Sequence, residues 1–158
     1  FCFSALTGEA KAQALKTQNG ISQSVEFQGG IANNTGDLRQ VNPIVFGRYG
    51  VQLKASVNED IAVFAELGVN GGHTQFRWSE NQPFNQHFFF SPDLRLGLKW
   101  INSRFEPYVF LRTGALTNGG WESDSGIGTS VQIVDHFSLV GQLSIQSLAL
   151  TGGIRTQF

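Results

Sequence analysis

The chain of 158 residues is 41% apolar and 15% charged, with 11 basic and 12 acidic side chains. Its formal charge of −1 gives no electrostatic basis for binding nucleic acid, and its single cysteine, Cys2, excludes a disulfide framework or a cysteine-based zinc site. No apolar run approaches the roughly 18 residues of a transmembrane helix. The absence of such a run does not exclude a membrane β-barrel, because the apolar residues of a barrel strand alternate with polar ones.

The first fourteen residues predict the end of a secretory signal. Phe1–Leu6 is apolar, and Ala12-Gln13-Ala14 is an A-x-A site of the kind that signal peptidase cleaves. We therefore expect 1–14 to be a residual signal peptide and 15–158 to form a single domain. A short N-terminal helix is the alternative, because the residues from Glu9 to Lys16 are good helix formers.

From residue 20 onward, apolar and polar residues alternate with a period of two in eight successive segments. The segments are 20–31, 46–57, 61–70, 93–101, 105–115, 126–133, 137–146 and 150–158. Strict alternation over about nine residues predicts a strand. Eight such strands with no helix between them predict an all-β meander.

The lengths of the links and the composition of the polar face indicate that the apolar face contacts lipid rather than a protein core. Tight turns at 58–60, 102–104 and 134–136 alternate with longer links at 32–44, 70–87 and 116–123. Short turns at one end and long loops at the other are typical of outer-membrane barrels. The polar face mixes charged residues with glycines, which leave room for long side chains inside a narrow eight-stranded barrel.

Aromatic residues gather near both ends of the strands, as they do at the two interfaces of a bilayer. They are Trp100, Phe105, Phe137 and Phe158 at the tight-turn end, and Phe46, Tyr49, Phe88 and Phe90 at the loop end. The sequence therefore predicts an eight-stranded antiparallel up-and-down transmembrane β-barrel. A soluble, lipocalin-like ligand-binding barrel is the alternative.

Three segments, Pro107–Phe110, Gly126–Gly128 and Gly153–Phe158, resemble the small opacity-protein and outer-membrane-protein-A-type β-barrels. The resemblance covers about residues 20–158. It implies a bacterial outer-membrane location, both chain ends in the periplasm and loops that face outward. It also implies the lipid bilayer, lipopolysaccharide and the barrel-assembly machinery as partners, with the terminal Phe158 as an assembly signal. It leaves activity open, because members serve as adhesins, anchors, narrow channels or, in a few relatives, lipid hydrolases.

The hairpin between the fourth and fifth strands predicts specific ion pairs in the lumen. Centring it on Asn102 and Ser103 makes paired residue numbers add up to 205, which sets Lys99 opposite Glu106 and Asp93 opposite Arg112. A slip by one residue would turn these charges toward lipid. Glu66 and Arg95 share the same polar face. We expect these six residues to plug the lumen: Lys99, Glu106, Asp93, Arg112, Glu66 and Arg95.

Three motifs invite a catalytic or metal interpretation. His136-Phe137-Ser138 is similar to the H-x-S pair of lipid A deacylases, but no acidic residue follows Asp135 to orient the histidine. Strand phase points His73 outward and His87 inward, so they do not form a metal site. Glu66 and Glu106 could form a paired-carboxylate site, but the basic residues of neighbouring strands favour ion pairs. No catalytic residue, metal or cofactor is predicted.

The second long link offers the best candidate contact surface. It carries Phe76, Trp78 and Phe84 among polar residues, and aromatic residues in polar company are typical of interfaces. Packing within the loop is the alternative.

We therefore predict a non-enzymatic outer-membrane barrel with a plugged polar lumen and a structural, adhesive or partner-contact role through its extracellular loops. A narrow channel for small or apolar solutes is the alternative function. A lipid A deacylase-like hydrolase and a soluble ligand-binding barrel are less favoured.

Overall fold

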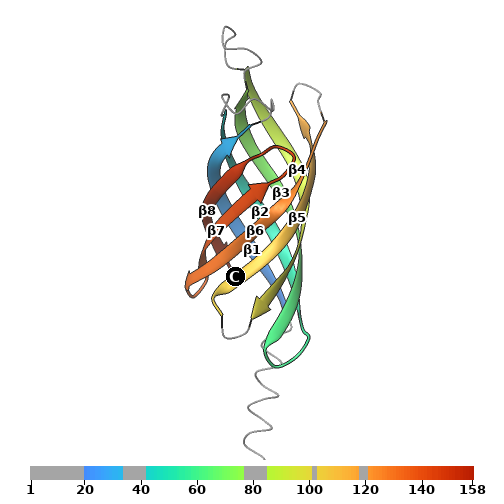
Figure 1. The fold of residues 1–158 in the computed structure, drawn as a ribbon, viewed down its shortest axis with the longest axis vertical. Helices are drawn as coiled ribbons and strands as arrows, with labels where there is room; N and C mark the ends of the chain where they lie inside the picture. The colour runs from blue at the N-terminus through green and yellow to red at the C-terminus, as the bar shows by residue number, and fades with distance from the viewer. Residues whose placement is uncertain (1–19, 34–41, 77–84, 101–102, 118–120) are drawn as a thin grey trace, which may run out of the picture.

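The computed structural model describes residues 20–33, 42–76, 85–100, 103–117 and 121–158. Eight antiparallel strands follow one another in chain order around a closed barrel (Figure 1). They are β1 (Gly20–Ala32), β2 (Asn42–Ser56), β3 (Ile61–Phe76), β4 (Asn85–Trp100), β5 (Phe105–Leu116), β6 (Trp121–Val134), β7 (Phe137–Ser144) and β8 (Leu150–Gln157). The predicted signal segment, 1–14, and the predicted domain start at residue 15 lie outside the described residues.

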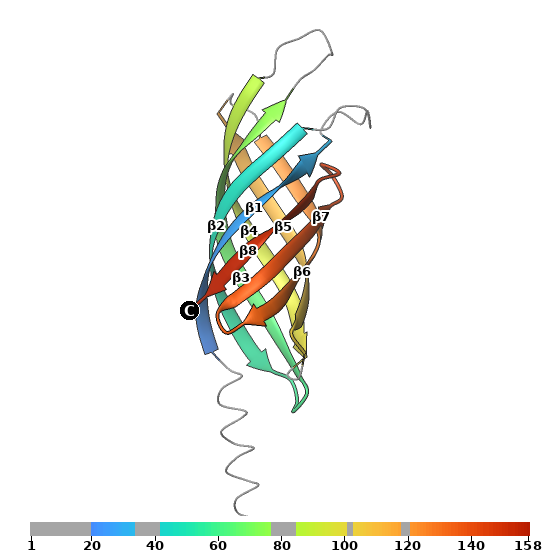
Figure 2. The ribbon, with the colours of Figure 1, turned by 90° about the vertical axis from the view of Figure 1, so that its left-hand side faces the viewer.

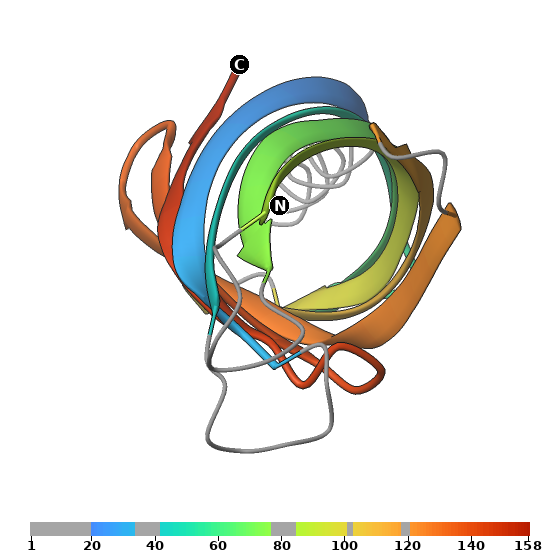
Figure 3. The same ribbon diagram turned by 90° about the horizontal axis from the view of Figure 1, so that it is seen from above.

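The first and last strands pair with each other and so close the sheet. The β1–β8 ladder runs from Ser24 opposite Gln157 to Ile31 opposite Leu150, and a view along the axis shows a closed ring (Figure 3). All eight predicted strands and their antiparallel up-and-down order are confirmed. Within the described residues, no helix is long and apolar enough to cross a membrane.

The barrel is polar inside and apolar outside. On its outer face, Leu67 and Val109 are 66% and 54% exposed, whereas the inward-facing Glu26 and Arg95 are 0% exposed. Proteins that fold in water bury apolar side chains and rarely bury charged ones completely. The outer surface of this barrel therefore matches a hydrocarbon environment, and the fold is that of a transmembrane β-barrel.

The strands are longer at the loop end than the sequence predicts. β3 and β4 have 16 residues each and stay in register as far as Phe76 opposite Asn85, so the predicted link at 70–87 is wrong and the connection is 77–84. The predicted links at 32–44 and 116–123 are too long as well, because β2 begins at Asn42 and β6 at Trp121. The apolar alternation in the sequence ends before the strands do, because backbone pairing continues as far as Phe76 opposite Asn85.

The barrel wall is uneven in height. β7 and β8 have only 8 residues each, half the length of β3 and β4. In Figure 2 the connection between β7 and β8 ends well below the upper ends of β3 and β4. The inner surface near the loop end is consequently bounded by a tall wall on one side and a low wall on the other.

Seven of the eight predicted interface aromatics lie on the outer face; Phe46 does not. Phe46 is buried inside the barrel, where its ring contacts Phe89 edge-on with a centroid distance of 6.1 Å. Its neighbour Val45 takes the outward position instead and is well exposed. The phase of β2 accounts for this, because Tyr49 faces outward and strand residues alternate, so residue 45 rather than 46 shares its face.

Candidate functional site

The middle of the lumen holds three carboxylates and three guanidinium groups. They come from five strands, because β1, β2, β3, β4 and β8 each turn a charged residue inward at this level. The set is Glu26, Arg48, Glu66, Asp93, Arg95 and Arg155, and each residue is at most 5% exposed. We call these six residues the central network. With three charges of each sign, its formal net charge is zero.

Arg95 and Glu26 form the tightest pair of the central network. Arg95 Nη1 and Nη2 donate to Glu26 Oε1 and Oε2 at 2.5 and 2.9 Å. Gln28 Nε2 donates to Glu26 Oε2 at 2.8 Å. This two-pronged geometry is the strongest form of arginine–carboxylate contact, and it joins β4 to β1 across the lumen.

Arg48 joins the other two carboxylates. Its Nη1 donates to Glu66 Oε1 at 2.8 Å, and its Nε lies 2.9 and 3.0 Å from the two carboxylate oxygens of Asp93. Arg155 Nη2 reaches the same Glu66 oxygen at 3.0 Å, and Ser24 Oγ donates to it at 2.6 Å. Each carboxylate of the network is thus neutralised by at least one arginine from another strand.

Glycines on the inner face make room for these side chains. A methyl group at Gly68 would collide with the Arg48 guanidinium and with Asp93, and one at Gly50 would collide with Arg48 and Glu66. The predicted mixture of small and large inward residues therefore has a specific use here. It leaves space for the Arg48 guanidinium beside Gly50 of β2 and Gly68 of β3.

A second charged cluster lies nearer the tight turns. Lys99 Nζ is 2.5 Å from Glu106 Oε1, and Lys54 Nζ is 3.7 Å from the same oxygen. The Lys54 and Lys99 side chains are 18% and 23% exposed, whereas those of the central network are at most 1% exposed in their ion pairs. Water can therefore screen this cluster more strongly than the central network.

The residues of the other expected pair, Asp93 and Arg112, lie opposite each other in the β4–β5 ladder but do not form an ion pair. The two residues are opposite each other, and the β4–β5 ladder has the predicted sum of 205. The Asp93 carboxylate turns to Arg48, with Arg95 Nε also 3.3 Å away. Arg112 instead lies over the rings of Phe46 and Phe110, at 4.8 and 5.4 Å from their centroids.

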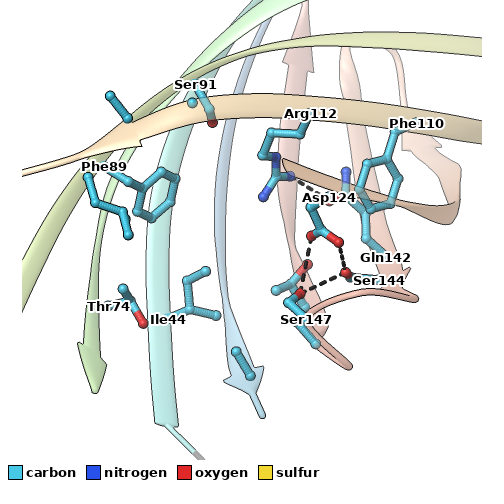
Figure 4. A pocket seen from close by; sticks show the side chains of 16 residues that line it. Ile44, Thr74, Phe89, Ser91, Phe110, Arg112, Asp124, Gln142, Ser144 and Ser147 are labelled. Carbon is cyan, nitrogen blue, oxygen red and sulfur yellow. Dashed lines mark hydrogen bonds between the residues drawn. The ribbon is translucent and has the colours of Figure 1, made fainter. Parts of the chain in front are cut away.

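A cavity opens above the central network, at the loop end of the lumen. Its empty volume is about 630 Å³, counting the solvent at its mouth. Asp124 on β6 lies on its wall and accepts hydrogen bonds from Ser144 Oγ and Ser147 Oγ (Figure 4). Sequence analysis missed Asp124 because it began the sixth strand at residue 126, whereas β6 begins at Trp121. Extending the inward phase of Gly126 and Gly128 by one step would have found Asp124. We call this cavity the vestibule.

The histidines considered for chemistry lie apart. His136 is in the β6–β7 turn, where its Nδ1 lies 2.9 Å from the carbonyl oxygen of Gln157. His73 pairs with Phe88 on the outer face, whereas His87 pairs with Thr74 on the inner face. Within the described ranges, no group of three or more histidine, cysteine or acidic residues could hold a metal ion.

The remaining predicted sites concern the long link and the last residue. Trp78 and Phe84 lie outside the described residues. Phe76 is the last residue of β3, and the structure describes its backbone only. Phe158 is exposed on the outer face, and its backbone exchanges hydrogen bonds with that of Gln23. Its role in assembly stays a prediction.

Comparison with known proteins supports the fold of this chain but does not assign the chain to a family. No family model matches the chain, and no curated protein sequence matches it either. A structure described as "De novo design of transmembrane beta-barrels" is 16% identical with a TM-score of 0.51, covering 89% of this chain and 97% of that one. The crystal structure of Ail, the attachment invasion locus protein of Yersinia pestis, is 15% identical with a TM-score of 0.44, covering 89% and 99%.

We predict that Glu26→Gln destabilises the barrel far more than Glu106→Gln. Removing the Glu26 charge leaves Arg95 without its two-pronged partner in a dry lumen, and breaking a buried ion pair costs about 3–5 kcal/mol. Lys54 and Lys99 can turn toward water when Glu106 is neutralised. The measurement is the free energy of unfolding by urea in liposomes. The same Glu→Gln change is made at both sites, so each variant is the control for the other. Equal destabilisation by both changes would show that the central network contributes no more to the free energy of unfolding than the cluster of Lys54, Lys99 and Glu106.

Proposed function

We propose that this chain is a non-enzymatic outer-membrane barrel whose lumen is plugged and whose loop end serves as a structural, adhesive or partner-contact surface. The observation that carries the proposal is that the central network spans the bore. Its arginine contacts join β4 to β1, β2 to β4 and β8 to β3, none of which are neighbouring strands. Side chains that meet across the barrel leave no straight path for solutes along its axis.

A buried apolar cluster lies inside the barrel together with the network and supports the same proposal. Phe64, Tyr108, Phe110 and Val140 form a buried cluster on the inner face. Gln142 Nε2 donates to the Tyr108 hydroxyl at 3.0 Å, which ties this cluster to β7. Ionic and apolar filling together favour a plug over the alternative of a narrow channel.

The location and partners of the barrel form part of the same proposal. An apolar outer face with aromatic residues near both ends suits the outer membrane, with the lipid bilayer and lipopolysaccharide around it and the barrel-assembly machinery inserting it. The tall β3–β4 wall projects farther than a membrane requires, since each of its strands has 16 residues, whereas a tilted transmembrane strand needs about 9–11. An extracellular partner would meet this wall first.

Hydrolysis has no support from the arrangement of described residues. The turn histidine, His136, is engaged by the Gln157 carbonyl oxygen, and Ser138 lies on the inner face beside it in sequence. Asp135 precedes this pair in the turn, and the chain holds no acidic residue after it. A serine–histidine–acid relay needs the acid to orient the imidazole.

We expect the wild-type protein to show no steady conductance in planar bilayers. Replacing two members of the bore-spanning network with small residues, as in Glu26→Ser combined with Arg95→Ser, should open a measurable pore because their side chains occupy the axis. Heat-modifiable migration in SDS gels serves as the folding control for both proteins. A stable ohmic pore in the wild type would contradict the plugged lumen and favour the channel.

We also expect the connection between β7 and β8 to face the cell exterior and the β2–β3 turn to face the periplasm. In a Cys2→Ser background, a membrane-impermeant maleimide added to intact cells should label Gln146→Cys and spare Asp60→Cys. Both positions are exposed in the structure, at opposite ends of the barrel. Lysed cells should label both, which controls for reactivity. Labelling of Asp60→Cys alone in intact cells would reverse the orientation.

A further inference from the structure

The vestibule has two chemically different walls. In Figure 4, Ile44 and Phe89 stand on one side, and Arg112, Asp124 and Ser144 stand on the other. Ile44 and Phe89 belong to β2 and β4, whereas Arg112, Asp124 and Ser144 belong to β5, β6 and β7.

Arg112 differs from the other inward arginines. Each of Arg48, Arg95 and Arg155 has a carboxylate oxygen within 3.0 Å, whereas Arg112 has none within 4.0 Å among the described residues. Among the described residues, its Nη2 donates a long hydrogen bond to Gln142 Oε1 at 3.3 Å, and its buried Nε has no partner. The vestibule therefore contains a guanidinium group that has no described carboxylate partner and whose Nε donor is unused.

The nearest acidic residue does not neutralise this guanidinium. Asp124 is directly opposite Arg112 in the β5–β6 ladder. Its carboxylate is held instead by the Ser125 backbone amide at 3.0 Å, by Ser147 Oγ at 3.1 Å and by Ser144 Oγ. With its acceptors occupied by these donors, Asp124 leaves Arg112 available to a ligand.

A second unpartnered polar group lies on the same cavity. Ser91 on β4 is 3% exposed, lines the vestibule and has no hydrogen-bond partner for its Oγ. Buried polar atoms are nearly always hydrogen-bonded, so each exception needs an explanation. A bound molecule that fills the vestibule would supply the missing partners of both Ser91 and Arg112.

We propose that the vestibule binds a small organic anion with an apolar body, such as an aromatic monocarboxylate. The carboxylate accepts hydrogen bonds from Arg112, whose guanidinium is already oriented by the rings of Phe46 and Phe110. The apolar body packs against Phe89 and Ile44 on the facing wall. Binding needs no passage through the barrel, since the central network lies below the site, so the inference stands apart from the conductance of the lumen.

The test uses 4-fluorobenzoate as the probe and the full barrel in nanodiscs of zwitterionic lipid, read by fluorine NMR. The wild type should bind the probe saturably. Arg112→Gln should weaken binding at least about tenfold, because a charge-assisted hydrogen bond is lost. Arg104→Gln is the matched control, since Arg104 is exposed in the β4–β5 turn at the opposite end, and it should bind like the wild type.

Two further arms separate the anion from its apolar body and guard against misfolding. The neutral 4-fluorobenzamide should bind at least about tenfold more weakly than the acid. Ala149→Leu, which adds volume to a buried residue of the vestibule wall, should also weaken binding of the acid, and heat-modifiable migration must show both variants folded. Absence of saturable binding to the wild type, equal binding by Arg112→Gln, or equal affinity for the amide would each overturn the proposal.

Discussion

Charges that are removed from water must be neutralised within the lumen, and the rest of this barrel is arranged around that requirement. Desolvating a carboxylate or a guanidinium group costs several kcal/mol, roughly, unless a partner and hydrogen bonds replace the water. The central network meets the requirement with three carboxylates and three arginines that contact one another across the bore. Ser24 and Gln28 add hydrogen bonds to two of the carboxylates.

The network in turn constrains the strands that carry it. Register must hold, because a slip by one residue would move Arg48 or Glu66 from the lumen into lipid. Gly50 and Gly68 must stay small, because larger residues would displace the Arg48 guanidinium. The apolar outer face then follows from alternation, since each inward charge forces its neighbours outward. The vestibule begins where this filling ends, and there Arg112 has no carboxylate partner within the described residues.

Local pattern predicted the sheet well and the lumen only in part. Alternation predicted the eight strands, and the tight turn at 102–104 predicted the β4–β5 register, because these depend on neighbours along one strand or one hairpin. The partners of Asp93 could not be predicted in this way: it lies opposite Arg112 in register, yet Arg48 of β2 binds it. Contacts across the bore depend on how the closed barrel staggers its strands, and no single hairpin encodes that. Phe46 was misplaced and Asp124 was missed for a simpler reason, since the phase of each strand was not extended far enough toward the loops.

A double-mutant cycle between Glu26 and Arg95 tests most directly whether cross-lumen neutralisation stabilises the barrel. The four proteins are the wild type, Glu26→Gln, Arg95→Met and the double variant, each unfolded by urea in liposomes. If the two charges neutralise each other, the double variant is less destabilised than the sum of the single variants, with a coupling energy of about 2–3 kcal/mol. Strictly additive effects would contradict the account, because each charge would then be compensated independently of the other.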